Sequence, residues 1–398
     1  MTERRVPLRD SSGKKTDVFF RCASHELGDP DNSALTLSLL PSMFSDRPLI
    51  CEGSIDALLL ENVDRIQAIL QRFFNWRRIE RQEFYGPDAE ALARIVEIEA
   101  PAQSELRAQG QGDGQTPSQS QSRSHREGAR AKGVGCFFTG GLDSFYTLLT
   151  HQEEITHLVF VLGYDVPTES VFAKEVVERL GLIARGLGKE LVVLETDLRK
   201  TSDRLIHWHM YHGCALAAAG QLLAPVIGKI YVPSTYTYED LSPLGSHPLL
   251  DPLWSTTDLE LVHHGLEKDR PQKALLVGNS ELARQHLRVC WENRHGQYNC
   301  GECEKCIRTL VEFAVGGQTV DSIPARFSLD DIERLPLDPR VTKFWRASLA
   351  MAQQEQPNSD LTRAIEKRLK QTPLKWLRSV PGRVRKDLKH VVQSSRIT

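Results

Sequence analysis

The chain has 398 residues, 40% of them hydrophobic, and a formal net charge of −2 at pH 7. That length and apolar content suffice for one main hydrophobic core and a smaller domain. No apolar h-region opens the chain and no run of about eighteen apolar residues occurs in it, which argues against a signal peptide and a membrane span. We therefore expect a cytoplasmic protein, a compartment that suits its eight cysteines.

Residues 1–100 predict a small separate α+β domain whose position ahead of the main core suits substrate recognition or homodimer contacts. An amphipathic helix is expected over Ala57–Phe74. Strands are expected at Asp17–Cys22, Ala34–Leu40, Leu49–Ser54 and near Ile95–Ile98. Residues 101–132 are rich in Gln, Ser, Gly and Arg and hold almost no large apolar side chains, so they predict a flexible linker.

A glycine-rich loop occupies residues 138–144, Phe-Thr-Gly-Gly-Leu-Asp-Ser, between the apolar run Val134–Phe138 and the helical pattern Phe145–Thr150. Successive glycines let the backbone approach a ligand, and the N–H groups of the first helical turn converge on an anion. The spelling lacks the Gly-Lys-Ser/Thr ending of a Walker A loop, which disfavours ordinary γ-phosphoryl transfer. The alternative is a plain turn with an Asp or Ser helix cap.

Alternating strand and helix patterns follow the loop. Short apolar runs predict strands at Thr156–Leu162, Glu190–Leu194 and Lys229–Pro233, and amphipathic stretches at Ser170–Gly188 and Ile206–Leu223 predict the helices between them. Continuous apolar strands joined by crossover helices indicate an α/β fold with a parallel sheet covered by helices on both faces. Ligands are then expected at the carboxyl ends of the strands, where the glycine-rich loop lies.

Four of the eight cysteines are confined to one short segment with the spacing C-x9-C-x2-C-x2-C. They are Cys290, Cys300, Cys303 and Cys306. Closely spaced thiolates suit a closed, structural tetrahedral Zn²⁺ site, although an iron–sulfur cluster would accept the same ligands. Lys305, Arg308 and Arg294 would offset the thiolate charge. The other cysteines, Cys22, Cys51, Cys136 and Cys214, are expected to be small core residues.

The loop resembles the Ser-Gly-Gly-x-Asp-Ser loop of the N-type (PP-loop) ATP pyrophosphatases, with Thr139 in the place of the usual serine. Such a loop followed by a late four-cysteine site resembles the 7-cyano-7-deazaguanine synthase family over about residues 133–312. The resemblance implies a Rossmann-like, HUP-type domain at residues 133–330 that binds ATP, Mg²⁺ and Zn²⁺. Its implied nucleotide-binding residues are Thr139, Gly140, Gly141, Leu142, Asp143, Ser144 and Gly163.

The family's activity implies an ATP-dependent ligase or synthase. A substrate carboxylate or amide oxygen is adenylated with release of pyrophosphate, and ammonia or an amine then displaces AMP to give an amide or, after a second activation, a nitrile. Asp143, a candidate Mg²⁺ ligand, Ser144 and Lys273 are the expected catalytic residues. Lys273 would stabilise charge on the leaving pyrophosphate, but it and Arg288 also fit solvated helix-end cations.

Polar and aromatic residues follow two of the expected strands and are candidate substrate contacts. They are residues 163–165, Ser234–Asp240 and Ser246–Asp251. A surface loop rich in turn formers is the alternative for each of them. The substrate would be a small acid, or a carboxyl or amine group on a larger partner.

Residues 331–398 predict a helical, basic tail, with ten Lys and Arg residues from Lys367 onward and Asp387 as the single acid. Such a tail could bind nucleic acid, a protein or an anionic membrane, or dock on the acidic body. Two further functions stay open. An adenylating sulfurtransferase acting on RNA requires an exposed Cys136 or Cys214. A non-catalytic nucleotide or nucleic-acid-binding zinc protein requires only the tail and the metal.

Overall fold

The computed structural model describes residues 1–9, 15–45, 49, 51, 53–76, 132–324, 327–335, 337 and 341–370. Calls that fall elsewhere, namely the strand near Ile95–Ile98, nearly all of the linker at 101–132 and the basic residues beyond Lys370, lie outside the described residues.

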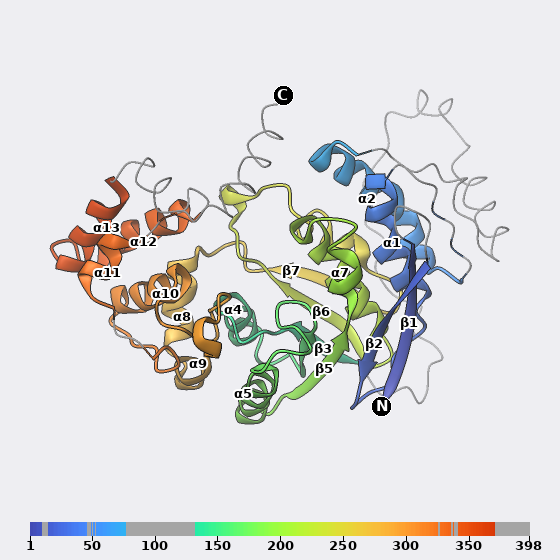
Figure 1. Cartoon of the computed structure of the whole chain (residues 1–398), viewed down its shortest axis with the longest axis horizontal. Coiled ribbons are helices and arrows are strands. Elements are labelled where there is room, and N and C mark those ends of the chain that lie inside the picture. The colour runs from blue at the N-terminus through green and yellow to red at the C-terminus, as the bar shows by residue number, and fades with distance from the viewer. Residues whose placement is uncertain are drawn as a thin grey trace, which may run out of the picture.

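A seven-stranded sheet forms the centre of the molecule (Figure 1). Its strands in spatial order are β1 (Thr2–Arg9), β2 (Lys15–Cys22), β5 (Glu190–Thr196), β4 (His157–Leu162), β3 (Gly133–Phe137), β6 (Ile227–Pro233) and β7 (Glu260–His264). The five strands from β5 to β7 are parallel, whereas β1 and β2 pair antiparallel with each other and β2 pairs antiparallel with β5. The predicted α/β fold with a mostly parallel sheet is confirmed.

Successive residues of the central strands face opposite sides of the sheet, and each side has its own core. On one side Phe137, Val159 and Val161 pack beneath three helices. These helices are α1 (Asp31–Ser45), α2 (Ala57–Phe74) and α7 (Trp208–Leu222). On the other side Cys136 and Phe160 pack beneath the rest. Here lie α4 (Leu142–Thr150), α5 (Ala173–Gly186), α8 (Arg270–Gly278), α9 (Glu281–His286) and α10 (Glu304–Val315).

The remaining helices form a third cluster beyond α10, on the far side of the sheet from α1 and α2 (Figure 1). They are α11 (Leu329–Arg334), α12 (Thr342–Glu355) and α13 (Asp360–Lys370), which surround the buried ring of Trp345. The short helix α6 (Leu198–Ser202) follows β5, and single 3-10 turns occur at Tyr238–Asp240, Asp251–Trp254 and Arg294–Gly296.

The predicted strand at Ala34–Leu40 is wrong, because these residues form the middle of α1. Leu35, Leu37 and Leu39 alternate with smaller residues in the sequence, a period typical of a strand. In the structure the helix is buried on several sides at once, so Thr36 between the leucines and Ser33 before them are buried as well. Thr36 donates to Gln221 Oε1 at 3.0 Å and Ser33 to the carbonyl of Ala218 at 2.9 Å, both on α7. In the sequence, small polar residues that are buried and hydrogen-bonded in this helix therefore look like the exposed positions of a strand.

The amino-terminal segment is not a separate unit in the part that the structure describes. Phe20 to Cys22 of β2 pair with Leu194 to Thr196 of β5, so its strands extend the main sheet. Helices α1 and α2 also share one hydrophobic core with α7. The expected strand at Leu49–Ser54 is described at four positions, none of which is a strand. The predicted helix at Ala57–Phe74 is confirmed, with Asp56 as its N-cap.

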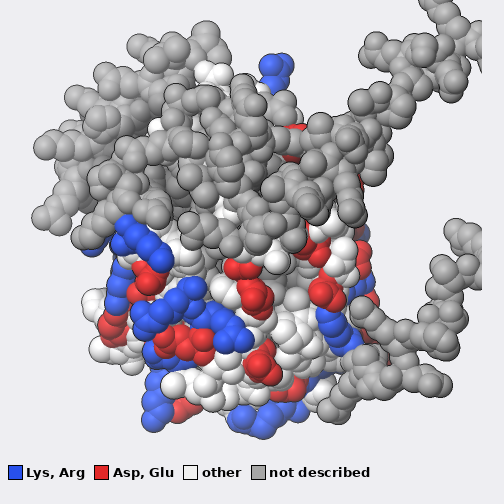
Figure 2. Space-filling view, turned by 90° about the vertical axis from the view of Figure 1, so that its right-hand side faces the viewer, with Lys and Arg blue, Asp and Glu red and all other residues white. Residues whose placement is uncertain are grey.

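The described surface shows mixed charge. The face that bears β1 carries interspersed basic and acidic side chains (Figure 2), and Glu3 there pairs with Arg21 at 2.8 Å and with Arg5 at 2.9 Å. No helix among the described residues is long and apolar enough to cross a membrane.

Candidate functional site at the switch point of the sheet

The glycine-rich loop joins β3 to α4 at the point where the strand order reverses. The chain proceeds from β3 to β4 and β5 on one side and then to β6 and β7 on the other. In open parallel sheets this switch point is where the loops at the carboxyl ends diverge and leave room for a ligand. Residues after β3, around Asp143, and after β6, around Thr235, therefore meet at one place: Thr235 Oγ1 donates to Asp143 Oδ2 at 3.0 Å.

The loop conformation requires glycine at residue 140. Gly140 has φ of +73°, and an added Cβ would lie 3.2 Å from Leu180. Its carbonyl accepts a 2.8 Å hydrogen bond from the backbone N–H of Arg288, which ties the loop to the segment before the cysteines. Gly141 is then the extended N-cap of α4, with no side-chain cap for the first helical N–H groups. Such unpaired donors at a helix start favour an anion.

Ser144 and Thr139 contribute unequally to this end of α4. The hydroxyl of Ser144 is buried and donates to the carbonyl of Gly141 at 2.9 Å, so it closes the first turn of the helix. Thr139 is half-buried, and its hydroxyl lies 3.2 Å from the position that a Cβ on Gly141 would take. Leu142 is buried, so only its backbone can take part. The hydroxyl of Thr139 is the one left facing the glycines.

Asp143, in the first turn of α4, faces several cations. Its Oδ1 lies 3.3 Å from Lys273 Nζ and its Oδ2 lies 3.7 Å from Arg270 Nη1. Burial acts to raise the pKa of Asp143, but the charges of Lys273, Arg270 and Lys305 outweigh it, so this pKa lies below its ordinary value. The carboxyl group is therefore ionised at neutral pH.

Both cations beside Asp143 are held rigidly from α8. Lys273 is fully buried and also donates to the carbonyl of Ser234 at 2.6 Å. Arg270 Nε lies 3.1 Å from Glu312 Oε2 on α10, and its Nη2 donates to Thr309 at 3.1 Å. Glu312 is fully buried, and burial raises its pKa. The buried Glu312 thus holds the Arg270 guanidinium behind the loop, within reach of Asp143.

Arg288 is a buried cation without a carboxylate. Its Nη2 donates to Asn293 Oδ1 at 3.3 Å, but its Nε has no hydrogen-bond partner, and no acid of the described residues lies within ion-pair distance. Burial lowers the pKa of this guanidinium. An arginine that is 8% exposed, has no carboxylate at ion-pair distance and lies beside a glycine-rich loop could bind an anion.

Two residues expected at the ligand end of the strands make structural contacts. Gly163 has φ of +110°, and an added Cβ would lie 1.9 Å from the carbonyl oxygen of Thr196, so a close backbone contact between β4 and β5 explains the glycine. Asp251 is 1% exposed and accepts from Ser246 at 2.7 Å, with His263 Nδ1 at 2.6 Å. Its carboxylate holds the 251–254 turn against β7, and no contact joins it to Asp143 within the described residues.

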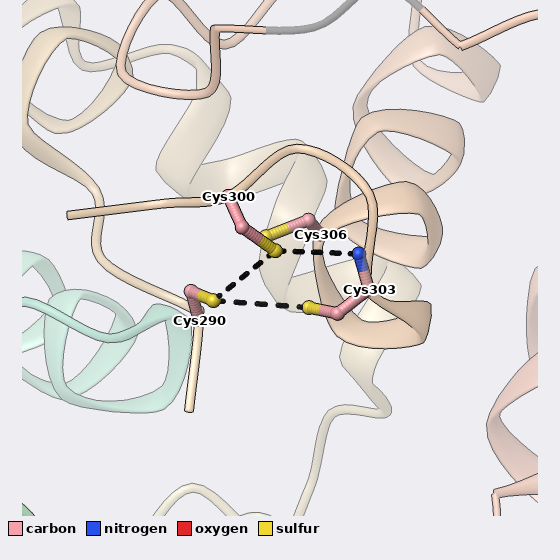
Figure 3. A group of neighbouring side chains, drawn as sticks. All are labelled: Cys290, Cys300, Cys303 and Cys306. Atoms are coloured by element: carbon pink, nitrogen blue, oxygen red, sulfur yellow. Dashed lines mark hydrogen bonds between the residues drawn. The ribbon is translucent and has the colours of Figure 1, made fainter. Parts of the chain in front are cut away.

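The four predicted cysteines form one buried cluster (Figure 3). Cys290 Sγ lies 3.5 Å from Cys300 Sγ and 3.9 Å from Cys303 Sγ, and all four sulfurs lie within 4.8 Å of one another. Around zinc with bonds of about 2.3 Å, neighbouring sulfurs lie about 3.8 Å apart. The four close, buried cysteines could therefore hold a metal ion such as zinc.

Backbone groups complete the cysteine cluster. The N–H of Asn293 donates to Cys290 Sγ at 3.2 Å, and that of Cys303 to Cys300 Sγ at 3.4 Å. Left-handed residues, Asn293 and Gly301 among them, turn the chain around the sulfurs. Arg294 pairs with Glu292 at 2.6 Å, which raises its pKa, and the thiolates of Cys300 and Cys303 act on it less strongly.

The sequence analysis missed Arg270 and connected Lys305 only with the thiolates. Arg308 pairs with Glu304 at 2.8 Å, and the charges that act most strongly on Lys305 are those of Arg270, Arg308, Asp143 and Asp165. Burial and the neighbouring arginines lower the pKa of Lys305. The sequence around Arg270 indicates only the start of a helix: Asp269 and Gln272 form a capping box, and Pro271 lies in the first turn.

Comparison of the chain with protein-family models and with curated proteins finds no match.

Proposed function

We propose that the chain is an ATP-dependent enzyme of the N-type pyrophosphatase class, related to the 7-cyano-7-deazaguanine synthases and built on a HUP-type sheet. The observation that carries the proposal is Asp143 at the start of α4, held by the fully buried Lys273 beside a glycine-rich loop at the switch point. A site with uncapped helix N–H groups, an Arg288 that has no carboxylate partner among the described residues, and buried cations suits a polyanion such as a nucleoside triphosphate.

The reaction would divide among these groups as follows. A carboxylate or amide oxygen of the substrate attacks the α-phosphorus of ATP, and the bond to the bridging oxygen breaks with its electron pair leaving on pyrophosphate. The loop N–H groups, Lys273 and Arg288 would stabilise charge on that leaving group. With an activated carboxylate, ammonia or an amine then attacks the carbonyl carbon, AMP departs and the nitrogen loses a proton. With an activated amide, AMP departs as the amide nitrogen loses its two protons, which leaves a nitrile.

Mg²⁺ fits this site only together with phosphates. Asp143 is a single carboxylate surrounded by cations, with one oxygen already bonded to Thr235. Mg²⁺ is commonly held by one or two carboxylates plus substrate phosphates, where it neutralises phosphate charge. Asp143 would be the protein ligand in such an arrangement.

The sulfurtransferase alternative is not favoured. Cys136 is fully buried and Cys214 is 1% exposed. Burial raises the pKa of both thiols, whereas a sulfur carrier needs an accessible thiolate. Because the eight cysteines are unpaired, we also propose a reducing, cytoplasmic setting.

The test is mass spectrometry of nucleotide products after the full chain is incubated with Mg·ATP, ammonium and a panel of carboxylic acids. We expect AMP and pyrophosphate whose formation depends on one of the acids. Asp143→Asn and Lys273→Met should each lower AMP formation by about 100-fold or more, since they change groups aimed at developing charge.

Asp258→Asn is the matched control, because Asp258 pairs with Lys132 at 2.9 Å on the exposed surface. It should leave AMP formation unchanged. Release of ADP and phosphate would contradict the proposal, and so would AMP formation that survives both Asp143→Asn and Lys273→Met.

A further inference from the structure

Three side chains converge at the amino ends of β4 and β5. His25 Nε2 lies 3.1 Å from Glu190 Oε1, His157 Nε2 lies 3.5 Å from Glu190 Oε2, and ligand atoms of all three residues lie within 4.8 Å of one another. In a tetrahedral site with bonds of about 2.1 Å, neighbouring ligand atoms lie about 3.4 Å apart. We propose that His25, His157 and Glu190 bind a divalent transition-metal ion, with Zn²⁺ as the best-matched ion.

The fold brings the three residues together. His157 and Glu190 are the first residues of adjacent parallel strands and are direct cross-strand partners. His25 follows β2, which runs antiparallel beside β5, so the chain leaving β2 reaches the amino end of β5 (Figure 1). Two ligands thus belong to the parallel sheet and one to the amino-terminal hairpin.

Each imidazole is oriented through its other nitrogen, as metal-binding histidines usually are. His25 Nδ1 lies 2.8 Å from Ser24 Oγ, and His157 Nδ1 lies 2.7 Å from Thr156 Oγ1. The His157 ring also lies against Gly133, where an added Cβ would be 2.4 Å from the ring. The absence of a side chain at residue 133 makes room for this orientation.

The hydrogen bonds around His157 support a cation at this place. Thr156 Oγ1 accepts from the N–H of Val134 at 2.9 Å and donates its single proton to the Val134 carbonyl at 3.1 Å. When Thr156 makes this donation, it accepts from His157 Nδ1–H, and that tautomer of the ring has a lone pair on Nε2. That lone pair faces the carboxylate of Glu190, and a metal ion between them satisfies both.

The site is distinct from the proposed nucleotide site. The glycine-rich loop follows the carboxyl end of β3, whereas His157 and Glu190 open their strands at the opposite edge of the parallel sheet. Three protein ligands leave one position of a tetrahedral ion open, and the side chain of Glu190 is half-exposed. The bound ion would clamp the amino-terminal hairpin onto the sheet and keep one position accessible to solvent.

The test is metal content by mass spectrometry of the full chain after equilibration with ZnCl₂ and removal of unbound ion. We expect two equivalents of zinc in the wild type and one in the double variant His25→Ala, His157→Ala, with the cysteine cluster filled in both. Excess Zn²⁺ should raise the melting temperature of the wild type and leave that of the double variant unchanged. Gly133→Ala, which keeps every ligand, should also lose the second equivalent.

His151→Ala is the matched control. His151 Nδ1 lies 2.9 Å from Glu154 Oε1, a histidine–glutamate pair that belongs to neither group of candidate metal ligands in the described residues, so two equivalents should remain. Glu190→Gln, a change at a half-exposed side chain, gives the same test should the double variant fold poorly. One equivalent in the wild type, or two in both the double variant and Glu190→Gln, would overturn the proposal.

Discussion

The cysteine cluster and the glycine-rich loop are neighbouring regions that satisfy their polar groups in opposite ways. The four thiols lie against one another, none is more than 4% exposed, and backbone N–H groups point at two of the sulfurs. At the loop, by contrast, the first N–H groups of α4 are uncapped and Arg288 has no counter-ion among the described residues. A closed cluster of ligands suits a resident ion, whereas unpaired donors suit a ligand that comes and goes.

The two regions are joined by short stretches of chain. Arg288, whose N–H bonds to Gly140, lies two residues before Cys290, and Lys305, which acts on Asp143, lies directly before Cys306. A metal ion at the cysteines would therefore fix the segments that carry cations to the loop. We therefore predict that substitutions in the cysteine cluster also weaken ligand binding at the loop, whereas substitutions in the loop leave the cluster unchanged.

The largest expected effect is that of Cys303→Ser. Structural zinc sites contribute on the order of 10 kcal/mol, as much as the whole stability of a typical domain. We expect a loss of one zinc equivalent, a much lower yield of folded protein, and loss of ATP binding in what remains soluble. Metal content, thermal unfolding and ATP titration measure the three.

Cys51→Ser is its control, because Cys51 is a half-buried cysteine outside the cluster and should change none of the three measurements. A Cys303→Ser protein that is folded and still holds zinc would show that the ligand set is wrong. One that has lost zinc but binds ATP normally would show that the two regions are independent.

A second, smaller effect is the pH dependence of stability that His264, near the loop, should produce. His264 on β7 bonds to Thr147 of α4 at 3.0 Å. Burial, together with the charges of His151 and Lys273, lowers the pKa of His264 to about 4. The unfolded chain then binds more protons than the folded chain between about pH 4 and 6.5, so stability rises with pH across that window. The gain is about 3 kcal/mol at most.

The measurement is the free energy of unfolding at several pH values for the wild type and His264→Gln. The variant should show a flatter dependence between pH 4 and 6.5, because its side chain does not titrate. His207→Gln, which changes the N-cap of α7, is a control for loss of a histidine elsewhere. Equal slopes for the wild type and His264→Gln would contradict the assignment.

Local patterns predicted much of the fold and some of the candidate site. The helix at Ala57–Phe74 has an apolar stripe and the capping residue Asp56, so both its period and its start are visible in the sequence. Helix α1 fails the same approach because it is buried on several sides and its polar residues pair with α7. The joining of β2 to β5 was also invisible, since a separation of more than 170 residues leaves no local signal.

The side chains of the candidate site show the same difference between local signals and contacts that join distant parts of the chain. The spelling of the loop draws attention to Asp143, and the spacing of the cysteines predicts the cluster that the structure shows, because the residues of each motif are close in the sequence. Arg270 depends on Glu312, 42 positions away on another helix, and nothing near either residue reveals the pair. The charge of Lys305 was assigned to the nearest cysteines in the sequence, whereas in the folded chain it also helps to lower the pKa of Asp143.

The smallest expected effects come from alanine substitutions at two glycines, one in each region, which have nearly equal φ angles. Gly140 has φ of +73° and Gly296, in the cysteine segment, has φ of +68°. Alanine at either position costs roughly 1 kcal/mol for the left-handed conformation. An added Cβ at Gly296 meets nothing within 4 Å, whereas one at Gly140 meets Leu180 at 3.2 Å and lies 3.7 Å from Arg288. Denaturant unfolding should therefore show a slightly larger loss for Gly140→Ala.

The decisive difference between the two glycine variants lies in ligand binding. Gly140→Ala alters the backbone that would contact phosphate and should weaken ATP binding by more than its loss of stability explains. Gly296→Ala should keep both ATP affinity and zinc content, because its side chain would extend into open space. If both variants bind ATP as the wild type does, the loop is an ordinary turn and Asp143 is merely a residue of the first helical turn.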